Sequence, residues 1–229
     1  MTRLGRPRLH LLETDSTNER ARTLAAAGAP HGTLVTAAAQ TAGRGRQGRR
    51  WEAPAGTALL CSLVLRGHHE LVSLRAGLAV ADVAGAGAQV KWPNDVFLDG
   101  CKVAGVLVEG RPQDGWAVVG IGLNVAVDVA ALGPEARTRA GTLGRTPADV
   151  EPALAELLEA LAHRLDAPAD EVLAALRERD ALLGAPVAWA GGSGTGAGVD
   201  ASGGLRVRRD DGELEVLSAG EVHLGEPAA

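Results

Sequence analysis

The 229-residue sequence has few cysteines, no apolar run of membrane length and only a small excess of negative charge. Its two cysteines, Cys61 and Cys101, are too few for a disulfide framework and lack the spacing of zinc ligands, so we expect both to be reduced residues on strands. No apolar run approaches the ~20 residues that a membrane-spanning helix needs, and the N-terminus lacks the apolar segment of a secretory signal. The net charge of −5 argues against bulk binding of nucleic acid. We therefore expect a cytoplasmic protein that binds neither membranes nor DNA.

Lysine and asparagine are also rare. The chain uses arginine 21 times but contains only two lysines and three asparagines. This skew indicates a background pressure that replaces lysine by arginine wherever a bare surface charge suffices. Because arginine cannot substitute where a compact ammonium is needed, the surviving lysines are candidate functional residues. The five rare residues fall in four short segments that carry further signals, and they are Asn18, Lys91, Asn94, Lys102 and Asn124.

Residues 1–183 mix hairpin-linked strands with helices, which predicts an α+β domain with a largely antiparallel mixed sheet. Ser16 is the expected N-cap of the first helix, and Glu19 completes a capping box. The pattern predicts strands at 9–13, 33–39, 57–65, 90–92, 96–98, 101–109 and 116–125, and helices at 16–27, 71–83, 148–165 and 169–183.

Residues 184–229 show only short strand patterns between glycine-rich turns, which predicts a small all-β domain. We expect its strands at 186–190, 198–200, 205–208, 214–217 and 222–224. The glycine-rich stretch 191–198 is interpreted as a flexible hairpin tip.

The most specific segment is the loop 40–51, in which four arginines are interleaved with Gly43, Gly45 and Gly48. Glycines let a backbone approach a ligand, and guanidinium groups bind phosphate or carboxylate through paired hydrogen bonds. The loop therefore suits an anion, although a solvated basic loop or a nucleic-acid contact is the alternative. The three glycines also match a dinucleotide fingerprint, but residues 51–56 cannot open the helix that this fingerprint requires.

Three further segments carry candidate residues. In 91–95, Lys91 precedes a Trp-Pro corner that would hold its ammonium rigidly near a developing charge, although a surface lysine beside a core tryptophan is the alternative. In 102–109, Lys102 begins an apolar strand. In 120–124, Gly120 and Gly122 would let something flat lie against the strand, although tight strand packing explains them too.

Together with Asp15-Ser16-Thr17-Asn18, these segments resemble the biotin–protein ligase family in order, spacing and content. The resemblance covers about residues 9–125, and residues 198–205 are similar to the family's C-terminal SH3-like β-barrel. It implies a catalytic domain over 1–183 and an SH3-like domain over 184–229. It also implies a ligase that makes biotinyl-5′-AMP from biotin and ATP and passes biotin to a lysine of a biotin carboxyl carrier domain.

The resemblance assigns roles to individual residues. Lys91 and Arg46 are expected to be catalytic, with Lys91 as the main electrostatic catalyst. Mg²⁺ is expected to arrive with ATP rather than in a site built by the protein. Because 128–146 contains no aromatic residue, Arg137 or Arg139 is expected to cover the adenine. The expected biotin-binding residues are Ser16, Thr17, Asn18, Gln40, Gly43, Arg44, Gly45, Arg46, Lys91, Gly105 and Gly122, and the expected ATP- or adenylate-binding residues are Arg44, Arg46, Arg49, Trp51, Asn94, Lys102 and Asn124.

Two other functions compete with this hypothesis. A lipoate or octanoate ligase or transferase would share the fold, and a biotin-sensing or nucleic-acid-binding module would lack catalysis. The catalytic pattern begins within the first fifteen residues, so we expect no N-terminal helix-turn-helix and no repressor activity. A free sheet edge could pair two copies, so we expect a monomer or a weak homodimer.

Overall fold

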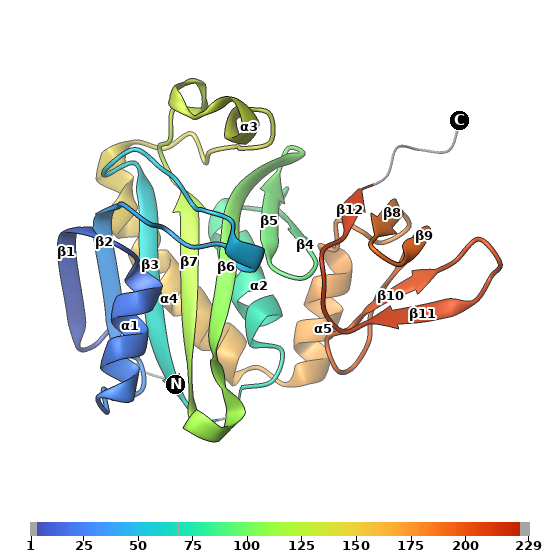
Figure 1. The fold of residues 1–229 in the computed structure, drawn as a ribbon, viewed down its shortest axis with the longest axis horizontal. Coiled ribbons are helices and arrows are strands. Elements are labelled where there is room, and N and C mark those ends of the chain that lie inside the picture. Colours follow the sequence, from blue (N-terminus) through green and yellow to red (C-terminus); the bar gives the residue numbers. More distant parts are fainter. Residues whose placement is uncertain (1–3, 68, 225–229) are drawn as a thin grey trace.

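The structure is a computed structural model that describes residues 4–67 and 69–224 (Figure 1). It contains a sheet of seven strands and a smaller C-terminal sheet of five. The expected α+β class with a largely antiparallel mixed sheet is confirmed. Within the described residues, no helix has the length and apolarity to cross a bilayer. Cys61 and Cys101 are free thiols on strands, as expected.

The seven-stranded sheet has the order β1-β2-β3-β7-β6-β5-β4. β1 and β2 are parallel, with Thr14 opposite Gln40, and the other neighbouring pairs are antiparallel. The carboxyl ends of β1 and β2 therefore meet at the same end of the sheet. The strands are β1 (Arg8–Thr14), β2 (Leu34–Gln40), β3 (Ala58–Arg66), β4 (Gln89–Lys91), β5 (Asp95–Leu98), β6 (Cys101–Arg111) and β7 (Trp116–Asn124).

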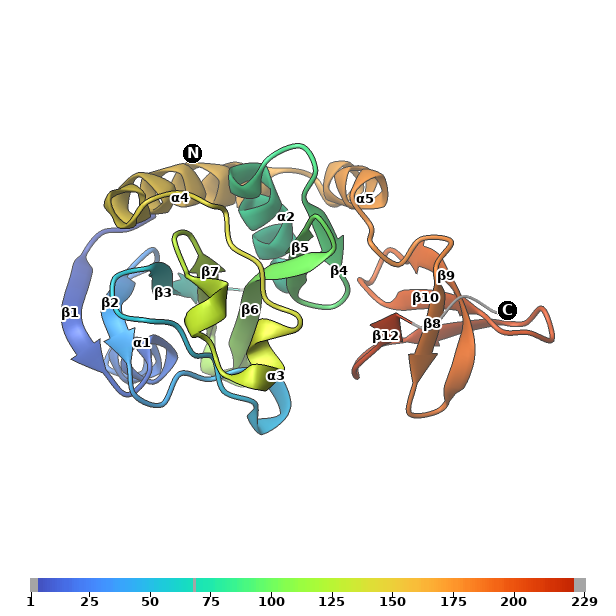
Figure 2. The ribbon, with the colours of Figure 1, turned by 90° about the horizontal axis from the view of Figure 1, so that it is seen from above.

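Helices cover both faces of this sheet (Figure 2). α1 (Thr17–Ala26) links β1 to β2 and packs on β2, β3 and β7. On the opposite face lie α2 (Val72–Ala84), α4 (Val150–Asp166) and α5 (Ala169–Glu178). The short α3 (Pro134–Arg137) lies on the α1 side. Single 3₁₀ turns complete the connections: η1 (Arg46–Gly48), η2 (Pro112–Asp114), η3 (Val129–Ala131) and η4 (Pro147–Asp149).

The main core lies between the sheet and the row of α2, α4 and α5. α2 is buried along nearly its whole length because its sequence is almost entirely apolar. Burying each large aliphatic side chain there stabilises the fold by about 1.5–3 kcal/mol. Arg75 is the charged exception, and its guanidinium donates to the backbone carbonyls of Glu70, Arg164 and Ala167. It therefore caps the last turn of α4, and these three hydrogen bonds accompany its buried charge.

The C-terminal sheet is antiparallel and has the order β11-β10-β9-β8-β12. Its buried residues, among them Val187 and Val207, belong to one cluster with the core of the large sheet. The cores of the two sheets are therefore continuous. The strands are β8 (Pro186–Trp189), β9 (Gly192–Val199), β10 (Leu205–Arg208), β11 (Leu214–Leu217) and β12 (His223–Leu224).

The interpretation of 191–198 as a flexible hairpin tip is wrong, because β9 runs through it. Its glycines allow close packing: a Cβ at Gly194 would lie 2.4 Å from the Arg208 carbonyl oxygen, and one at Gly196 would lie 2.0 Å from the Leu182 carbonyl oxygen. No side chain fits at these distances. The glycines therefore serve the packing of a strand rather than the flexibility of a turn.

The predicted helix 169–183 ends earlier, at Glu178. Beyond it, the Arg179 carbonyl accepts from the Val90 N–H at 2.8 Å, and the Ala181 N–H donates to the Val90 carbonyl at 3.1 Å. These bonds satisfy the free edge of β4, which is why the chain leaves the helix there. The helices predicted at 71–83 and 148–165 are confirmed as α2 and α4.

Candidate functional site

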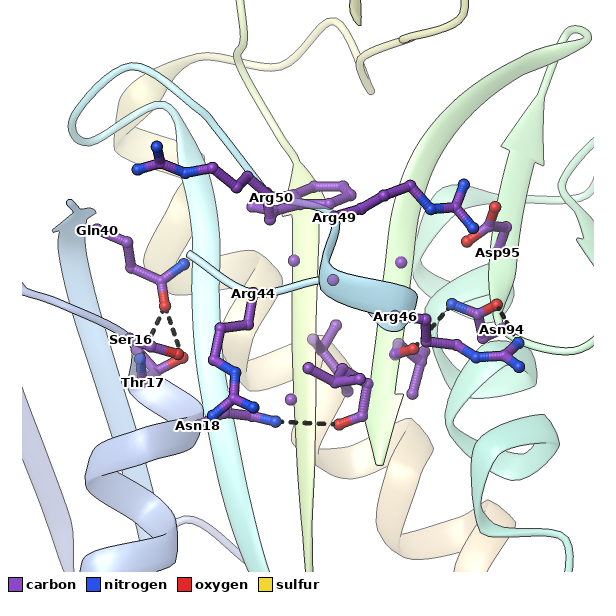
Figure 3. A pocket seen from close by; sticks show the side chains of 18 of the residues that line it. Ser16, Thr17, Asn18, Gln40, Arg44, Arg46, Arg49, Arg50, Asn94 and Asp95 are labelled. Atoms are coloured by element: carbon purple, nitrogen blue, oxygen red, sulfur yellow. Dashed lines mark hydrogen bonds between the residues drawn. The ribbon is translucent and has the colours of Figure 1, made fainter. Parts of the chain in front are cut away.

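A cavity opens over the α1 face of the large sheet, where the five sequence segments converge (Figure 3). The N-terminus of α1 and the end of β2 form one wall, and the starts of β5 and β6 form the other. The strands β6 and β7 form the floor, and the loop 44–51 crosses above it. The predicted site residues that line the cavity are Ser16, Thr17, Asn18, Gln40, Arg44, Gly45, Arg46, Arg49, Trp51, Asn94, Lys102, Gly105 and Gly122.

Gln40 fixes the wall formed by α1. Its Oε1 accepts from the Thr17 N–H at 2.7 Å and lies 3.1 Å from Thr17 Oγ1. The expected capping box is therefore wrong. Ser16 stands at the N-cap, but no side chain within the helix caps it, and Glu19 binds arginines instead. A residue from a neighbouring strand caps α1, which local sequence spacing could not reveal.

Ser62 on β3 ties the wall to the floor, and the sequence analysis missed it. The side chain is fully buried, and its Oγ lies 2.8 Å from Thr17 Oγ1 and 2.6 Å from Asn18 Oδ1. A Cβ at Gly120 would lie 1.9 Å from Asn18 Oδ1, so only glycine lets β7 approach this amide. A single serine inside an apolar strand pattern was the one available signal.

Trp51 lies flat on the glycines of β6 and β7. A Cβ at Gly105 would lie 3.2 Å from its ring, and one at Gly122 would lie 2.5 Å from it. Of the two glycines expected to admit something flat, Gly122 lies against the protein's own indole, whereas Gly120 lies against the Asn18 amide. The Trp51 Nε1 is buried without a hydrogen-bond partner among the described residues. An N–H in this state favours a ligand that brings an acceptor.

The loop arginines are held by acidic side chains and carbonyls. Arg44 lies 2.9 Å from carboxylate oxygens of both Glu19 and Glu109. Arg46 donates to Asn94 Oδ1 at 3.1 Å and to the Gly220 carbonyl at 3.0 Å, and burial lowers its pKa. The fourth, Arg50, was not a predicted site residue but lines the cavity as well.

The two lysines lie in different places. Lys102 lines the cavity, with its Nζ 2.7 Å from Asp95 Oδ1 and 5.8 Å from the centre of the Trp51 ring. Lys91 does not line it, and its ammonium donates to the Val222 carbonyl of the C-terminal sheet. Burial lowers the pKa of Lys91, and its proximity to Asp95 opposes that shift. Lys91 therefore lies outside the cavity lining in this structure, whereas Lys102 is part of it, and the catalytic role of Lys91 stays a prediction.

Gly43 and Asn124 also lie outside the cavity lining. A Cβ at Gly43 would lie 2.3 Å from the Trp51 carbonyl oxygen, so this glycine shapes the loop. Asn124 is 4 % exposed, and its Nδ2 donates to the Gly141 carbonyl at 2.8 Å. It therefore anchors the segment 128–146 at Gly141.

That segment borders the site through its backbone. The Lys102 N–H donates to the Arg139 carbonyl at 2.8 Å, and the Gly141 N–H donates to the Lys102 carbonyl at 2.7 Å. Neither Arg137 nor Arg139 lines the cavity, and the expectation that one of them covers the adenine stays a prediction. The segment instead holds the start of β6, and with it Lys102, in place.

Comparisons with known proteins agree on one family. Residues 12–126 match the model of the biotin/lipoate A/B protein ligase family. The chain is 38 % identical to a biotin–[acetyl-CoA-carboxylase] ligase of Paracoccus denitrificans, over 94 % of this chain and 99 % of that protein. It is 39 % identical to a bifunctional ligase/repressor of Bacillus subtilis, over 51 % of this chain and 40 % of that protein.

Solved structures show the same likeness. A biotin protein ligase of Aquifex aeolicus in complex with biotin and ATP superposes with a TM-score of 0.83 at 28 % identity, covering 96 % of this chain and 100 % of that one. A biotin protein ligase of Leishmania major in complex with biotinyl-5-AMP gives a TM-score of 0.61 at 26 % identity, covering 93 % and 98 %. The likeness therefore extends over both sheets.

Proposed function

The chain is a ligase that belongs to the biotin/lipoate A/B protein ligase family, and within it to the biotin–protein ligases; from this premise we propose its reaction. The enzyme joins biotin and ATP into biotinyl-5′-AMP and transfers biotin to a lysine of a biotin carboxyl carrier domain. The observation that carries this proposal is the convergence of five separate sequence segments on one cavity. That cavity combines a polar wall, a flat glycine floor and a cluster of cations.

The polar wall suits the ureido ring of biotin. Thr17, Asn18 and Gln40 offer hydroxyl and amide groups at the deep end of the cavity. A cyclic urea needs such partners, because each buried polar group left unpaired costs about 1–3 kcal/mol. The Gln40 oxygen already accepts from Thr17, so its amide nitrogen is the group that can donate to the ligand.

The cations suit the two anions that must meet. In the first step, a carboxylate oxygen of biotin attacks the α-phosphorus of ATP and pyrophosphate leaves. We assign the ammonium nearest this reaction to Lys102, because it lines the cavity and Lys91 does not. Arg44 and Arg46 approach from the loop, and their guanidinium groups offset the repulsion between carboxylate and phosphate.

The Trp51 indole, which covers the glycine floor, suits the nucleotide base as an aromatic neighbour, and Arg49 also lines the cavity. Within the described residues, no group of three acidic, histidine or cysteine side chains could hold a metal ion. We propose that Mg²⁺ is bound with the triphosphate, whose charge it offsets. In the second step, the acceptor lysine amine attacks the mixed anhydride and AMP leaves, while the loop shields the adenylate from water.

Residues 184–229 are proposed to form the SH3-like domain and residues 1–183 the catalytic domain. The five short antiparallel strands of the C-terminal sheet support this division. We also propose a monomer or weak homodimer, since β1 lies at the edge of the large sheet and exposes Leu12.

The test is incubation with biotin, ATP, Mg²⁺ and a biotin carboxyl carrier domain. The expected result is pyrophosphate release together with one biotinylated acceptor lysine. Pyrophosphate release without acceptor labelling would reduce the proposal to adenylate synthesis. Thermal stabilisation by lipoate plus ATP, but not by biotin plus ATP, would replace it with lipoate ligation.

A further inference from the structure

Glu109, near the end of β6, touches both the wall of the cavity and the loop above it. Its Oε2 accepts from Asn18 Nδ2 at 2.8 Å, and its Oε1 lies 2.9 Å from Arg44 Nη2. Asn18 and Arg44 line the cavity, whereas Glu109 lies behind them. One carboxylate therefore connects two cavity-lining residues that come from different elements of the chain.

The bond to Asn18 has a fixed direction. The acceptors of its Nδ2 are the Glu109 carboxylate and the Leu107 carbonyl, neither of which can donate. Its Oδ1 must then accept, and the fully buried Ser62 hydroxyl supplies the hydrogen at 2.6 Å. The amide is thus held on both sides, and any displacement of its nitrogen also displaces the Glu109 carboxylate.

Glu19 also forms an ion pair with Arg44, so its contacts can be compared with those of Glu109. Both carboxylates lie 2.9 Å from the same guanidinium. Glu109 is the more buried, with 18 % of its side chain exposed against 45 % for Glu19, so solvent screens its ion pair less. Glu19 pairs with Arg22 and Arg44 but has no bond to Asn18.

We propose that Glu109 is a positioning residue. It couples the binding of a ligand in the ring pocket, the part of the cavity lined by Thr17, Asn18 and Gln40, to the placement of Arg44 and its loop. The inference rests on the proposed function, because the occupant is taken to be biotin. A ligand bound beside Asn18 fixes that amide, the amide fixes the carboxylate, and the carboxylate fixes the arginine. The glycines that flank Arg44 let the loop adopt more than one arrangement, so its average position responds.

The substitution that separates the two bonds is Glu109→Gln. A carboxylate has two acceptor oxygens, whereas a carboxamide has one, so the variant can serve Asn18 or Arg44 but not both. Glu19→Gln is the matched control, because it removes the other carboxylate from Arg44 and leaves the contact with Asn18 intact. Both changes are isosteric and lie outside the cavity lining.

Trypsin reports the placement of the loop, since it cleaves after arginines and the side chains of Arg49 and Arg50 are more than half exposed. We expect biotin to slow loop cleavage about tenfold in the wild-type protein and in Glu19→Gln, but by less than about twofold in Glu109→Gln. Biotin affinity, measured separately by calorimetry, should change by less than about threefold in both variants, because Asn18 Nδ2 keeps the Leu107 carbonyl as an acceptor.

Full protection of the loop by biotin in Glu109→Gln would overturn the inference, as would an equal loss in Glu19→Gln. Either result leaves the proposed function intact. A wild-type protein that does not bind biotin would instead defeat the proposed function, and with it the occupant on which the coupling depends.

Discussion

At the scale of single residues, the two lysines have different partners. Lys102 faces Asp95 and Trp51 inside the cavity, whereas Lys91 is bound to the backbone of the C-terminal sheet. We expect Lys102→Met to lower kcat by about a hundredfold or more, because it removes a cation from the developing charge. Pyrophosphate release measures this. Lys91→Met should lose much less, and the reverse order of the two variants would restore Lys91 as the main electrostatic catalyst.

The glycine under Trp51 gives a second prediction. In Gly122→Ala the new methyl would lie 2.5 Å from the Trp51 indole, so the ring must move away from β7. We expect KM for ATP to rise about tenfold or more, because a displaced contact surface misplaces the nucleotide. Gly133→Ala is the control, since nothing lies within 4 Å of its added methyl. Equal kinetics of both variants and wild type would contradict the role of the glycine floor.

The cysteines differ in reactivity. Burial raises the pKa of the Cys61 thiol to about 12, so near neutral pH it remains protonated and inert. Cys101 is exposed at the start of β6. We expect iodoacetamide to alkylate Cys101 in the native protein and Cys61 only after unfolding, as mass spectrometry would show. Prompt native labelling of Cys61 would mean that β3 opens locally.

Prediction from sequence succeeded at the residue level where the site residues form a short contiguous motif, as in the loop 40–51. It failed for Ser62 and Glu109, which act through contacts 44 and 91 residues away in the chain. Scarcity marked Lys91 as special but could not show which way its side chain points, and its ammonium binds the Val222 carbonyl instead of lining the cavity. Tertiary packing alone supplies that information.

At the scale of elements, helix ends depend on neighbours. The capping box predicted from Ser16 and Glu19 is replaced by Gln40 from β2. Likewise β9 is a strand despite its glycines, because neighbouring backbone occupies the space that side chains would need. Element type followed from hydrophobic periodicity, since long apolar faces decide it. Helix caps and glycine-rich strands could not be predicted, because they depend on contacts with residues that are distant in the sequence.

The cap that Arg75 provides for α4 leads to a stability prediction. Arg75→Met would leave the carbonyls of Arg164 and Ala167 without this donor. We expect the free energy of unfolding to fall by about 2–3 kcal/mol, measured by urea denaturation. Arg177→Met, at an exposed position of α5, is the control and should change it by less than about 0.5 kcal/mol. A similar loss in both would show that the cap contributes little.

At the scale of the whole molecule, the two sheets are joined by polar contacts as well as by their shared core. Arg46, Lys91 and Trp92 donate to the carbonyls of Gly220, Val222 and Gly203, respectively. Because the core cluster runs through both sheets, we expect one unfolding transition whose calorimetric and van't Hoff enthalpies agree. Two resolved transitions would show that the C-terminal sheet unfolds separately.

The parallel pairing of β1 with β2 determines how the residues of the ring pocket are aligned with one another. β1 ends at Thr14, just before the wall residues Ser16, Thr17 and Asn18. β2 ends at Gln40, which pairs with Thr14 and belongs to the same wall. Adding a single amino acid inside β1 would slide Ser16, Thr17 and Asn18 along the sheet by ~3.3 Å and turn alternate side chains to the other face. An insertion in the connection between α1 and β2, at the end of these strands remote from the cavity, would leave this alignment untouched.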